Sequence, residues 1–212
     1  MVSAPAVRID ARVPQQSRSR KRRENILSAA NALIAQHGIL GLRMNDVAKL
    51  AQVPIGSVYQ YFPTKSVLVA CLFSRQLDFY HGLGRRYLRE VRRRQDVASK
   101  LRRLVTEVYE DNRSNVLMQE VWAGVQADRT IRKFHLQDNE FFVDLFVSVL
   151  RRARSAIPES LLRRRCQVVN EMWDGTIRLA ITLERKEGDA LVKESIDLGL
   201  ANLGLARSQA AF

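Results

Sequence analysis

The sequence has few of the residues, and none of the long apolar runs, on which secreted and membrane-spanning proteins depend. Its 212 residues include two cysteines and five prolines, and aromatic residues make up 7% of the chain. No apolar run approaches the roughly 20 residues that a spanning helix needs. The first residues include Arg8, Asp10, Arg12 and Pro14 in place of the apolar core of a secretion signal. We therefore expect a cytoplasmic protein with no membrane-inserted segment.

The sequence is equally poor in catalytic and metal-binding patterns. Its three histidines, His37, His81 and His135, have no carboxylate or thiol nearby at metal-ligand spacing. The only glycine pair that resembles a phosphate-binding loop is Gly82-Leu83-Gly84, which is too short a signal. Cys71 and Cys166 fall on apolar helical faces, which is typical of reduced cysteines that fill a core. These features predict no enzymatic activity, no metal and no cofactor.

Positive charge is what the sequence has in excess. The formal net charge is +13, and residues 1–70 carry 10 Lys and Arg against 3 Asp and Glu. Such an excess at one end of a chain indicates a polyanionic partner, and nucleic acid is the natural one. The remaining composition, 46% hydrophobic and 27% charged, is ordinary for a globular protein.

Two short helices separated by a turn are predicted within residues 44–62. Apolar residues at i, i+3, i+4 and i+7 mark one face of the first helix, and Val53-Pro54 ends it. The second helix begins near Ile55, with Val58 and Phe62 turned inward. It is expected to expose Ser57, Gln60 and Tyr61. This pattern is typical of a helix-turn-helix whose second helix enters the major groove.

The region from the basic run to Lys65 resembles the N-terminal domain of the TetR (tetracycline-repressor) family. The resemblance rests on Ile26-Leu27, Ala29-Ala30, Leu33, Gly38, Val47-Ala48, Val53, Gly56-Ser57 and the run from Tyr59 to Lys65. It covers about a quarter of the chain. Two positions depart from the family pattern, since Arg43 replaces a capping Thr and Gln52 replaces a turn Gly. If position 52 needs a left-handed backbone, Gln is expected to strain the turn.

An all-α fold of about nine helices is expected. We assign residues 1–18 to a flexible basic arm, 19–65 to the helix-turn-helix domain and 66–212 to a helical ligand-binding and dimerisation domain. Gly38 is expected to end the first long helix in a left-handed cap. Thr64 is expected to cap a helix that runs to about His81, followed by a basic connector over 82–94. Glu187-Gly188-Asp189 is expected to separate the last two helices.

The expected DNA contacts divide into positioning and reading groups. Arg43 and Lys65 lie at helix N-termini, where a phosphate meets both backbone amides and a cation. Ser57 and Gln60 are candidates for base edges, and Gly56 lets the backbone approach the duplex. The resemblance implies phosphate or sugar contacts for Tyr59 and Tyr61. The DNA-binding set is Arg43, Ile55, Gly56, Ser57, Tyr59, Gln60, Tyr61 and Lys65. The run Arg18, Arg20, Lys21, Arg22 and Arg23 either reaches the DNA or forms a solvated arm.

The remaining predictions concern dimerisation and control. The broad apolar faces of the last two helices predict a homodimer through Trp173, Ile177, Ile196 and Leu200; alternatively, these residues complete a monomeric core. A small apolar or aromatic effector is expected near Met118, Trp122, Phe142 and Trp173, unless these residues only fill the core. The function expected is a transcriptional regulator, a repressor that an effector releases from a pseudo-palindromic double-stranded operator. An architectural DNA-binding protein without an effector is the alternative.

Overall fold

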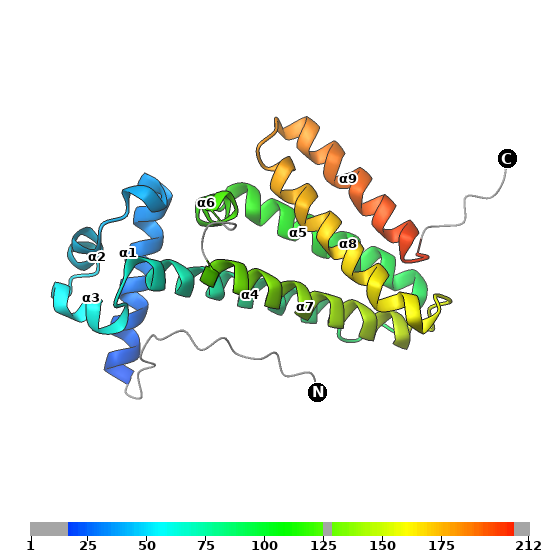
Figure 1. The fold of residues 1–212 in the computed structure, drawn as a ribbon, viewed down its shortest axis with the longest axis horizontal. Helices are drawn as coiled ribbons and strands as arrows, with labels where there is room; N and C mark the ends of the chain where they lie inside the picture. Colours follow the sequence, from blue (N-terminus) through cyan, green and yellow to red (C-terminus); the bar gives the residue numbers. More distant parts are fainter. Residues whose placement is uncertain (1–16, 125–128, 206–212) are drawn as a thin grey trace. The chain divides into compact units, whose positions relative to one another are not determined.

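In the computed structural model, the regular secondary structure formed by the described residues is entirely helical (Figure 1). The structure describes residues 17–124 and 129–205, and the expected arm over 1–18 lies almost wholly outside them. The expectation of an all-α fold with about nine helices is confirmed for the described residues. The helices are α1 (Ser17–Gly41), α2 (Met44–Leu50), α3 (Ile55–Tyr61), α4 (Lys65–Leu88), α5 (Arg94–Ser114), α6 (Val116–Gly124), α7 (Arg129–Arg152), α8 (Glu159–Ala180) and α9 (Arg185–Asn202).

The described chain divides into two compact units, and α4 and α7 contribute residues to both. Unit 1 contains residues up to 77 together with 115–134, and unit 2 contains 78–114 with the residues from 135 onward. The sequence-based boundary after residue 65 assigned α6 to the C-terminal domain. In the structure, α6 packs against α1 within unit 1. No described helix is long and apolar enough to cross a membrane.

The core of unit 1 follows the apolar periodicity of its helices. Ile26, Ala30 and Ile34, spaced four residues apart on α1, are fully buried, as is Val47 of α2. α1 packs against α2, and α2 packs against α3. This packing supports the short reading helices, because helices of seven residues are too short to be stable alone.

Gly38 interrupts α1 as the sequence predicted. Its φ of +68° is left-handed, a conformation that costs a side-chain-bearing residue free energy. The Glu120 carboxylate of α6 also comes within 2.5 Å of the point where a Cβ of residue 38 would lie. The same carboxylate accepts a 2.5 Å hydrogen bond from the backbone N–H of Ile39. Gly38 therefore permits both the turn of the chain and the approach of α6.

Two glycines that the sequence suggested as breaks lie inside helices instead. α4 continues through Gly84 to Leu88, so the expected connector over 82–94 is wrong for most of its length. A Cβ on Gly84 would come within 2.9 Å of Phe142 and Leu145 of α7. Gly188 lies within α9, where a Cβ would meet the carbonyl oxygen of Ala180 at 2.5 Å. Both glycines serve close helix packing rather than chain reversal.

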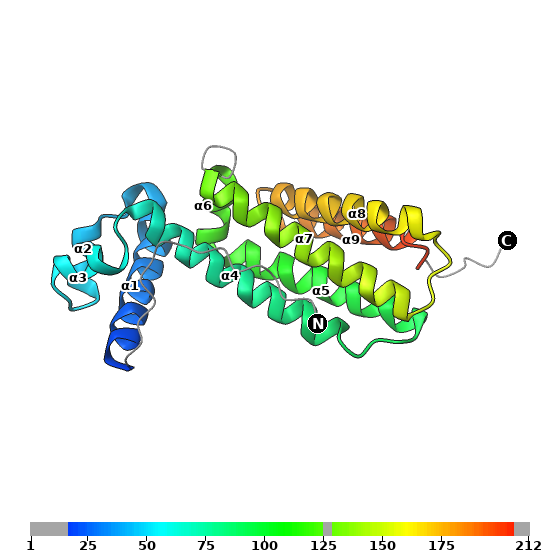
Figure 2. The ribbon, with the colours of Figure 1, turned by 60° about the horizontal axis from the view of Figure 1, so that its bottom comes forward.

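In unit 2, α8 and α9 lie side by side as a helical pair (Figures 1 and 2). The Trp173 indole of α8 is buried against α9, where its Nε1 donates a 2.9 Å hydrogen bond to the carbonyl oxygen of Ser195. A Cβ on Gly199 would lie 2.6 Å from this indole, so glycine makes the close approach of the two helices possible.

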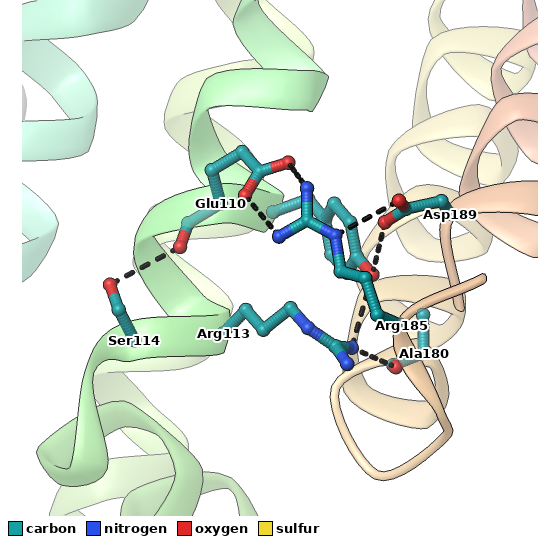
Figure 3. Close-up of polar contacts among 7 residues, drawn as sticks. Glu110, Arg113, Ser114, Ala180, Arg185 and Asp189 are labelled. Atoms are coloured by element: carbon teal, nitrogen blue, oxygen red, sulfur yellow. Dashed lines mark hydrogen bonds and ion pairs between the residues drawn. The ribbon is translucent and has the colours of Figure 1, made fainter. Parts of the chain in front are cut away.

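Two arginines connect α5 to the region where α8 ends and α9 begins (Figure 3). Arg113 donates hydrogen bonds of 3.1 Å to the carbonyl oxygen of Ala180 and 3.2 Å to that of Leu183. Arg185 binds both carboxylate oxygens of Glu110, at 2.9 and 2.6 Å. Carbonyl oxygens at the end of α8 thus find a cationic donor from another helix, which satisfies groups that a helix C-terminus leaves free.

The two cysteines are free and buried, in agreement with their expected role as core residues. Burial raises the pKa of the Cys71 thiol and raises the pKa of Cys166 to about 12. Because the thiolate is the reactive form, we expect iodoacetamide to label neither cysteine rapidly at pH 8 in the native protein. Mass spectrometry would show rapid labelling after denaturant is added. Rapid labelling of the native protein would contradict this assignment.

Candidate nucleic-acid interface

The turn between α2 and α3 adopts the strained form that its sequence indicated. Gln52 has a φ of +55°, so a glutamine occupies a left-handed position that the related pattern fills with glycine. Arg43 is the N-cap of α2, and its side chain forms no capping hydrogen bond among the described residues. Both departures from the family pattern therefore remove a local stabilising feature.

Gln52→Gly is expected to stabilise the protein by about 0.5–1 kcal/mol. The left-handed backbone costs a non-glycine residue about 1–2 kcal/mol, which the substitution removes. Glycine also gives the unfolded chain more conformational freedom, and this lowers the stability of the variant by about 0.4–1 kcal/mol. Urea denaturation measures the change. Gln36→Gly is the matched control, because Gln36 is exposed and helical in α1 and should lose stability. A loss of stability in both variants would contradict a strained turn.

α3 presents a polar and aromatic face to solvent. Gly56 and Gln60 are exposed, Tyr59 is 49% exposed and Ile55 is 37% exposed. Ser57 is half-buried, whereas Val58 and Phe62 are fully buried, as predicted. The exposure of Gly56, Tyr59 and Gln60 follows from helical periodicity, because positions three and four apart share one face of α3.

Tyr61 departs from the expectation that it is exposed. It is only 6% exposed, and its hydroxyl lies 2.7 Å from Ser19 Oγ of α1. Tyr61 lies three residues after the fully buried Val58, which places it on the inner side of α3. The predicted exposure is therefore wrong, and the hydroxyl serves a contact between α1 and α3.

The N-terminus of α4 lies directly after the reading helix. The backbone N–H of Val67 donates a 3.2 Å hydrogen bond to Thr64 Oγ1, so Thr64 caps α4 as expected. Lys65 is half-buried, and its Nζ donates a 3.1 Å hydrogen bond to the carbonyl oxygen of Leu40. An ammonium group has three N–H donors. This one therefore keeps donors for a phosphate while it is held against the end of α1.

The basic run lies on the first turns of α1. Arg18, Arg20, Lys21 and Arg22 are exposed. Arg23 is half-buried instead, with its guanidinium 5.4 Å from the ring centre of Phe62 and 3.7 Å from Glu24. The first four cations are thus accessible to a polyanion, whereas Arg23 contributes to packing beneath α3.

A cavity of about 720 Å³ lies in unit 1 beside the α4 N-terminus. Its lining comes from α1, α4, α6 and α7 and is mainly apolar. The lining residues are Ile39, Leu40, Lys65, Ser66, Val69, Val116, Gln119, Glu120, Val121 and Ile131. Apart from Lys65, which was predicted as a phosphate contact, none of these residues was singled out from the sequence, Glu120 included. Their only sequence signal is the apolar run of α6, which does not indicate which neighbours surround it.

The four residues predicted to contact an effector do not fall within one unit. Met118 and Trp122 belong to unit 1, where Trp122 packs edge-to-face against Phe73 at a ring distance of 6.0 Å. Phe142 and Trp173 belong to unit 2 and both pack against Phe146, at 5.9 and 5.8 Å. Trp122, Phe142 and Trp173 thus pack against other aromatic rings, and Met118 is fully buried.

The residues predicted for a dimer interface are buried within the chain itself. Trp173, Ile177, Ile196 and Leu200 are each 5% exposed or less, so they form the core around α8 and α9. Other apolar residues of these two helices are exposed instead, namely Leu161, Val168, Leu179 and Leu198. Dimerisation through α8 and α9 stays a prediction, with these exposed residues as its candidates.

Comparison with known protein families identifies this arrangement. Residues 26–72 match "Bacterial regulatory proteins, tetR family", and residues 95–203, about half of the chain, match "Tetracyclin repressor-like, C-terminal domain". The chain belongs to the TetR family. The family assignment covers the helix-turn-helix and most of unit 2, and it agrees with the resemblance found in residues 26–65.

Individual relatives match the chain over different lengths. The transcriptional repressor NemR of Escherichia coli is 34% identical over 59 residues, which are 28% of this chain and 30% of NemR. The match thus spans less than a third of the length of that curated relative. A TetR-family regulator from Streptomyces coelicolor is similar in structure, with a TM-score of 0.65 and 25% identity over 88% of this chain and 99% of that one. SmeT of Stenotrophomonas maltophilia, solved with triclosan, has a TM-score of 0.65 and 20% identity over 85% of this chain and 90% of SmeT.

Proposed function

We propose that this TetR-family protein is a transcriptional repressor that binds a pseudo-palindromic double-stranded operator. The observation that carries the proposal is the outward face of α3, where Tyr59 and Gln60 are exposed opposite the buried Val58. Gln60 is the proposed base-reading residue, since an amide can bond adenine through two hydrogen bonds. Arg43, Tyr59 and Lys65 are the proposed phosphate or sugar contacts. The proposed site of action is the cytoplasm, where the bacterial chromosome lies.

A homodimer would place two α3 helices on the two halves of the operator. An exposed apolar stripe on α8 supports this arrangement. Leu161, Val168 and Leu179 are separated by 7 and 11 residues, which are near whole numbers of helical turns, and the last two are more than half exposed. Leu198 of α9 is 55% exposed. A second copy of the chain would cover such residues and remove them from water.

We further propose that a small apolar or aromatic effector controls DNA binding through the unit 1 cavity. The triclosan complex of SmeT gives a precedent within related folds. Lys65 lines this cavity and also lies at the proposed phosphate contact. Glu120, which holds Ile39 at the end of α1, lines it as well. A molecule bound there would therefore contact both the helix that carries the reading domain and the phosphate-binding lysine.

The DNA-binding proposal is tested by protection mapping followed by a small set of variants. We expect one discrete palindromic footprint near a promoter. Lys65→Ala and Tyr59→Ala should weaken binding to all operator variants about equally, whereas Gln60→Ala should change which bases matter. A Lys65→Ala variant that relaxes one base position alone would contradict this division of roles.

The architectural alternative predicts a different footprint and no effector. Uniform protection along DNA would favour it over regulation.

Effector binding can be followed by tryptophan fluorescence, since Trp122 follows the cavity residue Val121. Triclosan and other aromatic compounds would be titrated into the protein with and without operator. An effector that prefers the DNA-free form about 100-fold would reduce operator binding by about 2.7 kcal/mol, and operator would weaken effector binding equally. Equal affinity in both titrations would exclude that compound as the effector.

A further inference from the structure

α7 and α8 bring an imidazole and two carboxylates together within unit 2. The ligand atoms of His135, Glu171 and Asp174 all lie within 4.8 Å of one another. His135 Nδ1 is 3.7 Å from Asp174 Oδ2. The buried side chain of Asn139 reaches the same cluster from α7, where its amide contacts the Glu171 carboxylate. No metal-ligand spacing around His135 was recognised in the sequence, because Glu171 and Asp174 come from another helix more than 30 positions away.

Carboxylates are concentrated around this cluster, although the whole chain is strongly positive. A third carboxylate, Asp138, lies close enough to raise the pKa of Asp174. Its Oδ1 accepts a 2.8 Å hydrogen bond from His81 Nε2 of α4. Arg178 is the cation that pairs with Asp174. The carboxylates of Asp138, Glu171 and Asp174, the guanidinium of Arg178 and the imidazoles of His81 and His135 are the ionisable groups named in these contacts. Burial raises the pKa of the Asp174 carboxyl to about 6, with Arg178 and His135 acting in the opposite direction.

We propose that His135, Asn139, Glu171 and Asp174 bind one divalent transition-metal cation of the Zn²⁺ or Co²⁺ class. His135 and Asn139 are four residues apart on α7, and Glu171 and Asp174 are three apart on α8, so each pair shares one helical face. One imidazole nitrogen with several oxygen ligands suits such ions. Bonds of about 2.0–2.2 Å to a tetrahedral ion place the ligand atoms about 3.3–3.6 Å apart. His135 Nδ1 and Asp174 Oδ2 are near that separation at 3.7 Å, whereas the pairs of atoms that now lie farthest apart, up to 4.8 Å, would have to approach by about 1 Å through side-chain rotation. The side-chain amide of Asn139 now directs its nitrogen at Glu171, and a rotation of this amide by about 180° would offer its oxygen to the cation.

The surroundings of the four ligands suit an occupied site. Arg178 contacts Asp174 Oδ2, which is also the oxygen that faces His135 Nδ1. A carboxylate has about four acceptor positions, so Asp174 can bind a cation through a remaining position while Arg178 orients it. Glu171 is exposed, which gives an ion a path from solvent. The bound cation would connect α7 to α8.

The test uses the full chain without an affinity tag, after treatment with a chelator. Calorimetric titration with Zn²⁺ and visible absorption with Co²⁺ are expected to show one equivalent per chain. His135→Gln and Glu171→Gln should each weaken binding at least about tenfold, since even groups that only support a ligand cost about 10- to 100-fold when removed. Zn²⁺ should also raise the melting temperature of the unmodified protein, because it binds the folded form.

A control variant removes the same chemical groups outside the cluster. His37→Gln combined with Glu140→Gln takes away an exposed imidazole and an exposed carboxylate, and it should bind Zn²⁺ as tightly as the unmodified chain. Circular dichroism checks that all variants are folded, and Glu171 is exposed, so its replacement should leave the fold intact. The proposal is overturned if no saturable binding occurs in the micromolar range. It is also overturned if folded Glu171→Gln and His135→Gln keep the original affinity, or if the control loses as much.

Discussion

Operator affinity is expected to fall by about 10³- to 10⁵-fold between about 50 mM and 200 mM salt. Each subunit exposes Arg18, Arg20, Lys21 and Arg22 on α1 and Arg43 before α2, and its Lys65 keeps free donors at the start of α4. A dimer that uses even half of these cations neutralises about six phosphates. Each neutralised phosphate contributes about −0.9 to the slope of log affinity against log salt, so the slope should be near −5 or steeper.

Single substitutions measure how much each cation contributes to the slope of log affinity against log salt. Lys65→Ala should make the slope shallower by about 1 for each subunit bound, with little change in base preference. Lys193→Ala is the matched control, because Lys193 is an exposed lysine of α9 in unit 2 and should leave the slope unchanged. Fluorescence anisotropy over a series of NaCl concentrations measures both. An affinity that does not depend on salt, or a preference for single-stranded DNA, would exclude the proposed interface.

A charge introduced on α8 or α9 is expected to have one of two large effects, depending on exposure. Trp173→Glu would bury an unpaired carboxylate in a position that is 3% exposed. The cost of several kcal/mol is a large part of the roughly 5–15 kcal/mol that stabilises a typical domain, so unit 2 should unfold. Leu198→Glu changes a residue that is 55% exposed, so the chain should stay folded. We expect this second variant to be monomeric and to lose binding to the full palindrome.

Sedimentation velocity and circular dichroism distinguish these outcomes. Lys193→Glu is the control, because it places the same carboxylate on α9 at an exposed position that already carries a charged side chain. It should remain dimeric and folded. A dimeric Leu198→Glu variant would remove α9 from the proposed interface, and the same substitution at Leu179 would then test α8. An unmodified protein that is monomeric at micromolar concentration and still binds the full palindrome would contradict the dimer altogether.

The sequence by itself determined the features that depend on neighbours along the chain. The apolar spacing of α2 and α3 predicted their inner residues, including Val58 and Phe62, because a helical period relates positions three and four apart. The left-handed caps and turns were equally local. Gly38 was expected to have a positive φ and has one, and Gln52 was expected to be strained if its position required the same conformation, which it does.

Only the tertiary structure decided the features that depend on which helices meet. A glycine in a sequence indicates a break in a helix or a close approach between helices equally well. In the structure Gly84 and Gly188 lie inside helices, where α7 comes close to Gly84 and the end of α8 comes close to Gly188. The hydrogen-bond partners of Tyr61 and Trp173, which are the Ser19 hydroxyl and the carbonyl oxygen of Ser195, come from other helices. The cluster of His135, Glu171 and Asp174 likewise exists only because α7 and α8 face each other. A helical period specifies which residues share a face, but the identity of the partner facing them is a property of the packed chain.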